Sequence, residues 1–185
     1  MPGTCRGCLR IWRPRASCRR WRDRSCVRLL AAQLDEAEQR IEDLDARIAA
    51  WHKASPASQR LATIPGIGPL VATAITATIA DPSTFRSGRE FAAWLGLVPR
   101  QRSTGGKQRL GRISREGDGY IRRLLIIGAQ AVLLRSKAAH ADPWMQGLLA
   151  RRPRLVVAVA LANKTARVAW AVMTKGQPYR QPAVA

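Results

Sequence analysis

The sequence predicts a mainly α-helical protein, and three observations support this class. Residues 30–51 carry apolar side chains alternately four and three positions apart, a repeat typical of a helix that packs against another helix. Segments 69–80, 119–136 and 154–174 are apolar over helical lengths. Strand signals are scarce, and the Val-rich run 155–159 is the one candidate.

Composition and charge point to a nucleic-acid partner. The chain has 185 residues, 46% of them apolar, which is enough for one domain with a core and an extension. Its net charge of +20 repels itself unless a polyanion such as nucleic acid neutralises it. We find no apolar run near the roughly 18–20 residues that span a bilayer and no secretory signal. We therefore expect no membrane contact and a bacterial cytoplasmic, nucleoid-associated protein with reduced thiols.

Residues 1–28 differ from the remainder of the chain. They hold nine Arg, no Lys and little apolar periodicity, which is typical of a disordered basic tail. Four thiolates could instead complete a tetrahedral zinc site, although only one pair has the CxxC spacing. A third interpretation is translation from a displaced reading frame. The cysteines concerned are Cys5, Cys8, Cys18 and Cys26.

Residues 29–55 are predicted to form a coiled-coil helix. Glu36–Arg40 and Asp43–Arg47 sit at i,i+4 spacing, where opposite charges support a helix. The apolar repeat is long enough for a homo-oligomer contact or for docking on the chain's own domain. We interpret the intervening acidic residues as a solvated face rather than a metal site. The repeat consists of Leu30, Leu34, Ala37, Ile41, Leu44, Ile48 and Trp51.

Residues 56–180 are predicted to form one compact helical domain that opens with a helix-turn-helix. Pro56 ends the preceding helix, and the turn "PGIG" contains Gly66 and Gly68. The second helix runs to about Ala80, where Asp81-Pro82 stops it. Glycines let backbone N–H groups approach a phosphate, so the turn is either a nucleic-acid contact of the helix-hairpin-helix type or a structural turn.

The remaining elements of the domain follow from their terminal signals. A short helix over 83–97 is predicted, with Ser83 or Thr84 as its cap. Asp118 is expected to cap the helix 119–136. Pro143 starts a short helix, and Gly176 ends the last one. Between them, residues 98–118 form a connection that is long for a compact domain, and such connections are commonly functional or disordered.

This long connection and the helix after it are rich in positive charge. Arginine side chains form bidentate contacts with phosphate, so we predict a surface that holds a nucleic-acid backbone without reading bases. The alternative is a solvated basic loop. The predicted nucleic-acid-binding residues, besides the two turn glycines, are Arg100, Arg102, Lys107, Arg109, Arg112, Arg115, Arg122 and Arg123.

Ser103 and Thr104 lie against two glycines within this basic run. A serine attacks phosphorus only when a base or metal takes its proton and cations hold the phosphoryl oxygens. The arginines supply the second requirement, but neither His52 nor His140 is near in sequence. The residues alone therefore leave two roles open for Ser103, a turn or phosphate contact and a nucleophile.

Three motifs give the chain a family resemblance. The stretches "IPGIG", "GLVPRQRSTGGKQRLGRIS" and "ALANKTARVAWA" resemble the C-terminal transposase domain of the insertion-sequence one-ten family, nearest its eleven-eleven subgroup. The similarity covers about residues 29–180. It implies that Ser103, with Thr104 as the lesser candidate, is a catalytic nucleophile that forms a 5′-phosphoserine link to DNA. It also implies a structured guide RNA and a RuvC-like domain whose DEDD carboxylates bind Mg²⁺.

The chain departs from the family pattern at its N-terminal end. Residues 1–28 stand where the RuvC-like domain belongs and resemble no part of it, so this chain is expected to bind no metal or other cofactor. We therefore expect a truncated transposase that binds DNA, possesses Ser103 and is inactive alone. The alternative is a non-catalytic helix-hairpin-helix nucleic-acid-binding protein.

Overall fold

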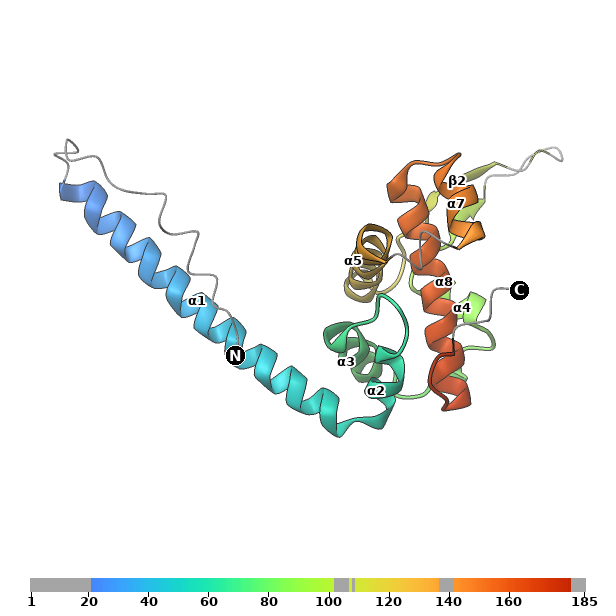
Figure 1. Cartoon of the computed structure of the whole chain (residues 1–185), viewed down its shortest axis with the longest axis horizontal. Helices are drawn as coiled ribbons and strands as arrows, with labels where there is room; N and C mark the ends of the chain where they lie inside the picture. Colours follow the sequence, from blue (N-terminus) through green and yellow to red (C-terminus); the bar gives the residue numbers. More distant parts are fainter. Residues whose placement is uncertain (1–20, 102–106, 108, 137–141, 181–185) are drawn as a thin grey trace. The chain divides into compact units, whose positions relative to one another are not determined.

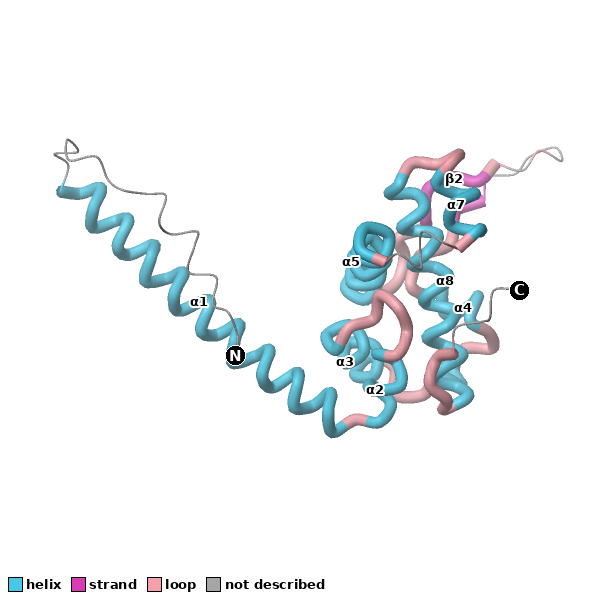
Figure 2. Tube along the Cα trace, viewed as in Figure 1, coloured by secondary structure: helices cyan, strands magenta, loops and turns pink. Residues whose placement is uncertain are grey.

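The computed structural model describes residues 21–101, 107, 109–136 and 142–180 (Figure 1). It divides the chain into two units, Met1–Leu44 and Asp45–Ala185. Helices dominate the described residues and two short strands are present, so the predicted mainly α class is confirmed (Figure 2).

The first helix, α1, spans Trp21–Ala54. It begins well before residue 29, so the predicted boundary with a disordered tail is wrong. Val27 lies three positions before Leu30 and extends the apolar repeat by one position. Glu36 and Arg40 form the predicted i,i+4 ion pair at 2.5 Å. Leu30, like Leu34, Ile41, Leu44 and Trp51 of the repeat, is exposed in the single chain, while Ile48 is half-buried. The coiled coil remains a prediction.

The second unit is a helical domain whose elements follow one another closely. After the C-terminal end of α1, two short helices flank the glycine turn, and a 3₁₀ helix, η2, precedes α4. A two-stranded hairpin then leads into three further helices. The elements are α2 (Pro56–Ala62), α3 (Pro69–Thr78), η2 (Pro82–Thr84), α4 (Gly88–Trp94), β1 (Pro99–Gln101), β2 (Leu110–Ile113), α5 (Gly119–Arg135), α7 (Pro143–Leu149) and α8 (Arg154–Lys175).

Helix α8 forms the centre of this domain. It packs against α5, α4, α2 and α7, and Leu161, Ala162 and Ala166 lie in the buried core. By length and composition alone it could cross a membrane, with a mean hydropathy of 1.4 over its most apolar 18 residues. The expectation that no segment has this length and composition is therefore wrong. Packing against four other helices accounts for the apolar character of α8 within this fold.

The structure places the strands where they were not predicted. Residues 155–159 lie in the first turns of α8, because Pro153 precedes a helix that packs on the domain core. The strands β1 and β2 lie instead inside the connection 98–118 and pair antiparallel, with Pro99 opposite Ile113. Most of their residues are exposed, so no buried alternation reveals them in the sequence.

The glycine turn between α2 and α3 packs directly on α5. Gly66 has a φ of +89°, in the left-handed region that favours glycine. A Cβ at Gly66 would lie 3.1 Å from the carbonyl oxygen of Gly128, and a Cβ at Gly128 would overlap the carbonyl oxygen of Gly66. The two backbones touch because both residues lack side chains. Gly68 precedes α3 and is exposed, with open space around it.

The contact between the turn and α5 predicts a large effect for a single methyl group. Gly128→Ala is expected to lower the free energy of unfolding by about 1–3 kcal/mol, because the added Cβ must displace a backbone carbonyl. Thermal unfolding followed by circular dichroism measures this. Gly147→Ala in α7, where a Cβ meets nothing within 4 Å, is the control and is expected to be neutral or slightly stabilising. Equal melting temperatures for the two variants would contradict the packing argument.

Most predicted caps are present, and one is wrong. Asp118 accepts hydrogen bonds from the N–H groups of Tyr120 and Ile121, and Gly176 ends α8 in a left-handed conformation. Helix α4, however, is shorter than the predicted 83–97. Its cap is Ser87, whose Oγ accepts a hydrogen bond from the Glu90 N–H. The Glu90 carboxylate in turn accepts from the Arg86 N–H, and this reciprocal pair fixes the start of α4 at this point.

The predicted caps Ser83 and Thr84 belong to the 3₁₀ turn η2 instead. Asp81 precedes this turn and accepts hydrogen bonds from the hydroxyl and N–H of Ser83, which lower the pKa of its carboxyl group. The stop at Asp81-Pro82 is therefore an Asp-capped turn, and α3 ends before it.

Candidate nucleic-acid interface

The β1–β2 hairpin carries the basic segment singled out in the sequence. Its described end is fixed by the pairing of Gln101 with Leu110. Residues 102–106 and 108 lie outside the described residues, and with them Arg102, Ser103 and Thr104. Lys107 and Arg109, on the same segment, are exposed. The structure therefore places the two strands that flank Ser103 but not Ser103 itself.

Arg122 joins the base of this hairpin, defined here as residues 95–98 before β1 and 114–117 after β2, to the helical core. From the first turn of α5, its half-buried guanidinium donates hydrogen bonds to the carbonyl oxygens of Leu95 at 2.9 Å and Glu116 at 3.1 Å. One of these carbonyls ends α4, and the other lies just after β2. A charged donor shared between the two segments fixes their separation. Arg122 therefore acts as a structural cross-link at this position.

Further contacts hold the same base. Arg100 donates to the Glu116 carboxylate at 2.9 Å, an exposed ion pair that spans the hairpin. The amide of Asn163 in α8 donates to the Leu97 carbonyl at 3.2 Å. Gly117, with a φ of +80°, lets the chain after β2 pass so close to the Trp94 carbonyl that no Cβ fits between them. These contacts fix the ends of the hairpin that flank β1 and β2 against the helices of the domain.

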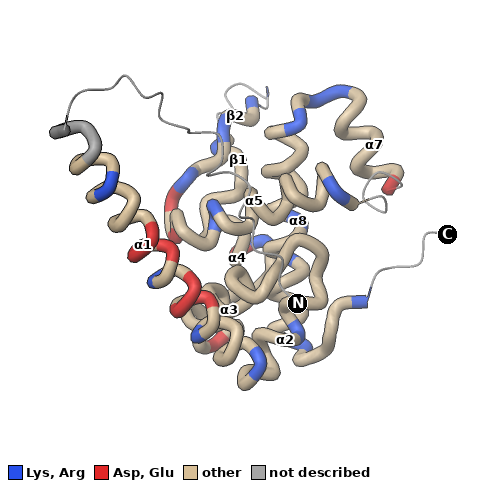
Figure 3. The backbone as a smooth tube through the Cα atoms, turned by 60° about the vertical axis from the view of Figure 1, so that its left-hand side comes forward, with Lys and Arg blue, Asp and Glu red and all other residues tan. Residues whose placement is uncertain are grey.

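A wide groove of about 2320 Å³ lies beside this base. The hairpin, α4, α5, α7 and α8 all contribute to its walls. Seven of its lining side chains are cationic, and no Asp or Glu occurs among the described residues that line it. The acidic residues gather instead on α1 (Figure 3). The cationic lining residues are Arg89, Arg112, Arg115, Arg122, Arg123, Lys164 and Arg167.

Most of these cations remain available to a ligand. Within the described part of the chain, no ion pair engages Arg123, Arg167 or the other exposed arginines of the groove, Arg89, Arg112 and Arg115. Lys164 lies 3.6 Å from the Asp142 carboxylate. Five guanidinium groups in one groove, without ion-pair partners among the described residues, create a positive potential that attracts phosphates. A phosphate bound there does not have to displace a carboxylate of the described chain.

The structure separates the predicted binding residues into groups. Arg112, Arg115 and Arg123 line the groove with exposed side chains. Arg100 and Arg122 hold the hairpin base through partners in the chain itself. Lys107, Arg109 and the turn glycines Gly66 and Gly68 do not line the groove. Nucleic-acid binding stays a prediction for every one of the predicted residues. The close packing of Gly66 on α5 already explains why glycine occupies that position.

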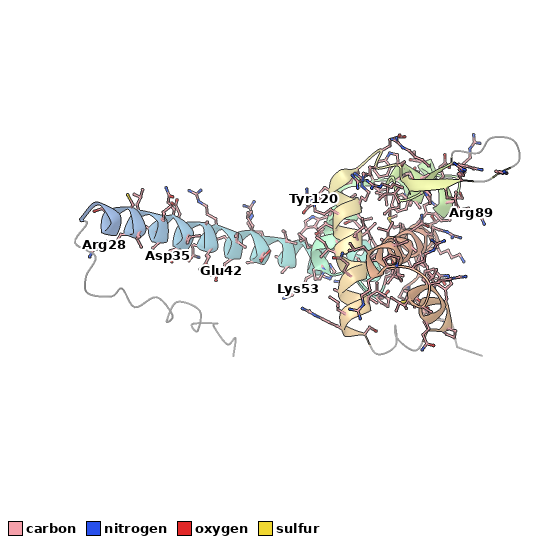
Figure 4. All side chains as sticks on the ribbon, turned by 90° about the horizontal axis from the view of Figure 1, so that it is seen from above. Arg28, Asp35, Glu42, Lys53, Arg89 and Tyr120 are labelled. Carbon is pink, nitrogen blue, oxygen red and sulfur yellow. The ribbon has the colours of Figure 1, made fainter. Side chains whose placement is uncertain are left out.

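Sequence reasoning missed three cations of the groove. Arg89 lies in the first turn of α4, and Lys164 and Arg167 lie on α8 (Figure 4 labels Arg89). One signal was available for α8, because Asn163, Lys164 and Arg167 form the polar stripe of an otherwise apolar helix. Nothing in the local sequence pairs this stripe with the hairpin, because the two are more than 50 residues apart.

No metal site is identified in the part of the chain that the structure describes. It contains no group of three or more His, Cys, Asp or Glu side chains that could hold a metal ion. Cys26 is exposed on α1, and Cys5, Cys8 and Cys18 lie outside the described residues, so the zinc interpretation is not tested. Among the described residues, His52 Nδ1 is hydrogen-bonded to Ser58 Oγ at 2.7 Å, and neither residue lines the groove.

Comparison with known proteins identifies relatives of this chain. Residues 58–145, from α2 into α7, match the family model "Transposase IS116/IS110/IS902 family". A probable family 20 transposase of Pseudomonas aeruginosa is 51% identical over 156 residues, which are 83% of this chain and 46% of the relative. A putative transposase of Sinorhizobium fredii is 48% identical over 76% of this chain and 37% of its own length.

A third relative is more distant in sequence. The transposase for insertion sequence element IS1111A of Coxiella burnetii is 38% identical over 82% of this chain and 42% of its own length. The chain thus spans less than half the length of these curated relatives.

Proposed function

The chain belongs to the IS116/IS110/IS902 transposase family through residues 58–145, and we propose that it is the DNA-holding, nucleophile-bearing part of a transposase. One observation supports this most directly. The hairpin that contains Ser103 rises from the edge of a groove lined by seven cations and, among its described residues, no carboxylate. In this proposal the groove holds the phosphate backbone and the hairpin presents a hydroxyl to it.

The groove suits backbone recognition without base reading. Guanidinium groups on α4, β2, α5 and α8 can contact phosphates on a strand that runs along the groove. Each neutralised phosphate releases condensed counterions, so affinity is expected to fall steeply as salt rises. A guide RNA, which the family resemblance implies, presents the same phosphate chemistry and is a second proposed nucleic-acid partner.

Ser103 is the proposed nucleophile, with Thr104 as the lesser candidate. In the step inferred from the resemblance, Ser103 Oγ forms a bond to phosphorus while the bond from phosphorus to the 3′ oxygen breaks. The serine hydroxyl gives up its proton, and the departing 3′ oxygen takes one up. Arginines around the phosphoryl oxygens stabilise the charge that develops in this step.

The family resemblance assigns Mg²⁺ to carboxylates of a RuvC-like domain. The described residues of this chain do not fit such a site. We therefore assign this chain phosphate binding and the nucleophile, and assign no metal ligand among its described residues. Helix α1, with its apolar repeat and exposed acidic residues, is the proposed site of homo-oligomer formation.

Removing the Ser103 hydroxyl tests this function. The full chain is mixed with DNA, Mg²⁺ and the remaining N-terminal part of a full-length relative, and a denaturing gel detects covalent protein–DNA adduct. We expect an adduct with the unaltered chain, none with Ser103→Ala, and an adduct with the control Thr104→Ala. DNA binding by Ser103→Ala is expected to stay within about twofold, since one hydroxyl adds little to backbone affinity.

Other outcomes of this experiment would decide against the nucleophile. An adduct that persists in Ser103→Ala, or that is lost only in Thr104→Ala, would reject Ser103. If no adduct forms with both parts present while the chain still binds DNA, the alternative of a non-catalytic nucleic-acid-binding protein is favoured.

A further inference from the structure

The groove contains an exposed apolar surface that phosphate binding does not use. Five large apolar side chains along it are between 41% and 67% exposed. The domain has a well-formed core elsewhere, with Phe91, Ile121 and Leu125 almost fully buried, so this exposure is not a sign of loose packing. The exposed residues, defined here as the apolar floor, are Tyr120, Ile127, Trp144, Leu155 and Val156.

The two aromatic residues of the apolar floor each lie at the start of a helix, where a hydrogen bond fixes their backbone. Tyr120, labelled in Figure 4, lies in the first turn of α5, where its N–H donates to the Asp118 carboxylate, and the residue is 54% exposed. Trp144 lies in the first turn of α7, where its N–H bonds to Asp142. These bonds fix the backbone of both residues at helix starts, and both side chains reach solvent beside the groove.

A cation is already placed on the Trp144 ring. Lys164 Nζ lies 4.6 Å from the ring centroid and 3.6 Å from the Asp142 carboxylate. The carboxylate holds the ammonium group, and the ammonium group orients the indole through a cation–π contact. Trp144 is 41% exposed as a residue, which leaves surface for a second planar group.

A duplex does not explain this combination of side chains. In duplex DNA or RNA the bases are stacked inside, and the outer surface offers phosphates to cations but no flat apolar face to a tyrosine or tryptophan. An unpaired strand offers both, because its phosphates contact cations while its bases stack on aromatic side chains. Grooves that bind single strands have this composition, in which cations flank exposed aromatic rings.

We propose that the groove binds a single-stranded segment of nucleic acid, with its phosphates on the exposed arginines and its bases on Tyr120 and Trp144. Ile127, Leu155 and Val156 provide apolar contacts to the same bases. This inference rests on the proposed function and specifies which form of nucleic acid occupies the groove. The absence of acidic residues from the described lining matches a polyanionic ligand.

The test compares one strand with its duplex. Fluorescence anisotropy measures binding of the full chain to a labelled oligothymidine of about 12 nucleotides and to the same oligomer paired with oligoadenosine, since single-strand sites span about 4–16 nucleotides. Tyr120→Ala and Trp144→Ala are each expected to weaken single-strand binding about 5- to 100-fold, because base stacking on one aromatic ring contributes about 1–3 kcal/mol. Duplex binding is expected to change less than about twofold.

Three controls keep the test independent of folding. Leu134→Ala removes an exposed apolar side chain of α5 that does not line the groove, and is expected to leave both affinities unchanged. Tyr120→Phe and Trp144→Phe keep an aromatic face and are expected to retain most of the single-strand affinity. Circular dichroism verifies that every variant has the helix content of the parent chain.

The outcomes separate this inference from the proposed function. A chain that binds neither oligomer would contradict the proposed function itself. Binding of both oligomers with equal losses, or with no loss, in the alanine variants would overturn only the single-strand inference. A further result would overturn the single-strand inference. If Leu155→Asp converts an oligomer to a monomer in sedimentation and leaves single-strand affinity unchanged, the apolar floor is a protein interface.

Discussion

The double variant Arg123→Ala/Arg167→Ala is expected to bind nucleic acid about 100-fold more weakly than the parent chain at low salt, about tenfold for each lost phosphate contact. The two side chains line the same groove from α5 and α8. Both are exposed, and neither has an ion-pair partner among the described residues. Their charges are thus free to act on a ligand.

The salt dependence gives this prediction a second readout. The logarithm of the binding constant falls linearly with the logarithm of salt concentration, with a slope set by the number of neutralised phosphates. Removing two phosphate contacts is expected to reduce that slope by about two. Anisotropy titrations at several salt concentrations measure affinity and slope together.

A charge-matched control distinguishes groove contacts from net charge. Arg86→Ala/Lys175→Ala removes the same two positive charges from exposed positions that do not line the groove. Its affinity is expected to fall much less, and its slope is expected to change by less than one. Equal effects of the two double variants would mean that binding depends on overall charge, and would contradict the assignment of the groove.

Much of the helical framework could be predicted from the sequence, because its signals are local. Asp118 caps α5 and Gly176 ends α8 where their residue types predict, since a cap depends on hydrogen bonds within a few residues. Pro143 starts α7 for the same reason. The exception is α4, where Ser87 outcompetes Ser83 and Thr84, since Glu90 three positions later completes a reciprocal cap.

The groove could be predicted only in part, because it depends on contacts between distant segments. Charge density in residues 100–123 indicated phosphate binding, and Arg112, Arg115 and Arg123 do line the groove. The contribution of α8 was missed, since Lys164 and Arg167 reach the groove only when α8 packs on α5. Composition also cannot distinguish a free arginine from one engaged by backbone carbonyls, which is the difference between Arg123 and its neighbour Arg122.

Arg122→Met is expected to lower the free energy of unfolding by about 3 kcal/mol, because two hydrogen bonds from a charged donor, each contributing about 1.5–3 kcal/mol, are lost. The carbonyl groups of Leu95 and Glu116 then lose the guanidinium that joins α4 to the end of β2. For a chain of this size the melting temperature is expected to fall by about 6–12 °C. Thermal unfolding monitored by circular dichroism measures the change.

The adjacent residue provides a matched control with the opposite expected result. Arg123→Met removes the same charge one position later, but Arg123 is exposed, and its guanidinium has no partner among the described residues. Its stability is expected to change by no more than about 0.5 kcal/mol, while its affinity for nucleic acid falls. Arg122→Lys distinguishes charge from geometry, because one nitrogen, Arg122 Nη1, donates to both carbonyls and the lysine nitrogen lies one bond nearer the backbone. We therefore expect Arg122→Lys to recover little stability. If Arg122→Met melts like Arg123→Met, the base of the hairpin is held by other contacts, and Arg122 is free to bind phosphate as its sequence position first indicated.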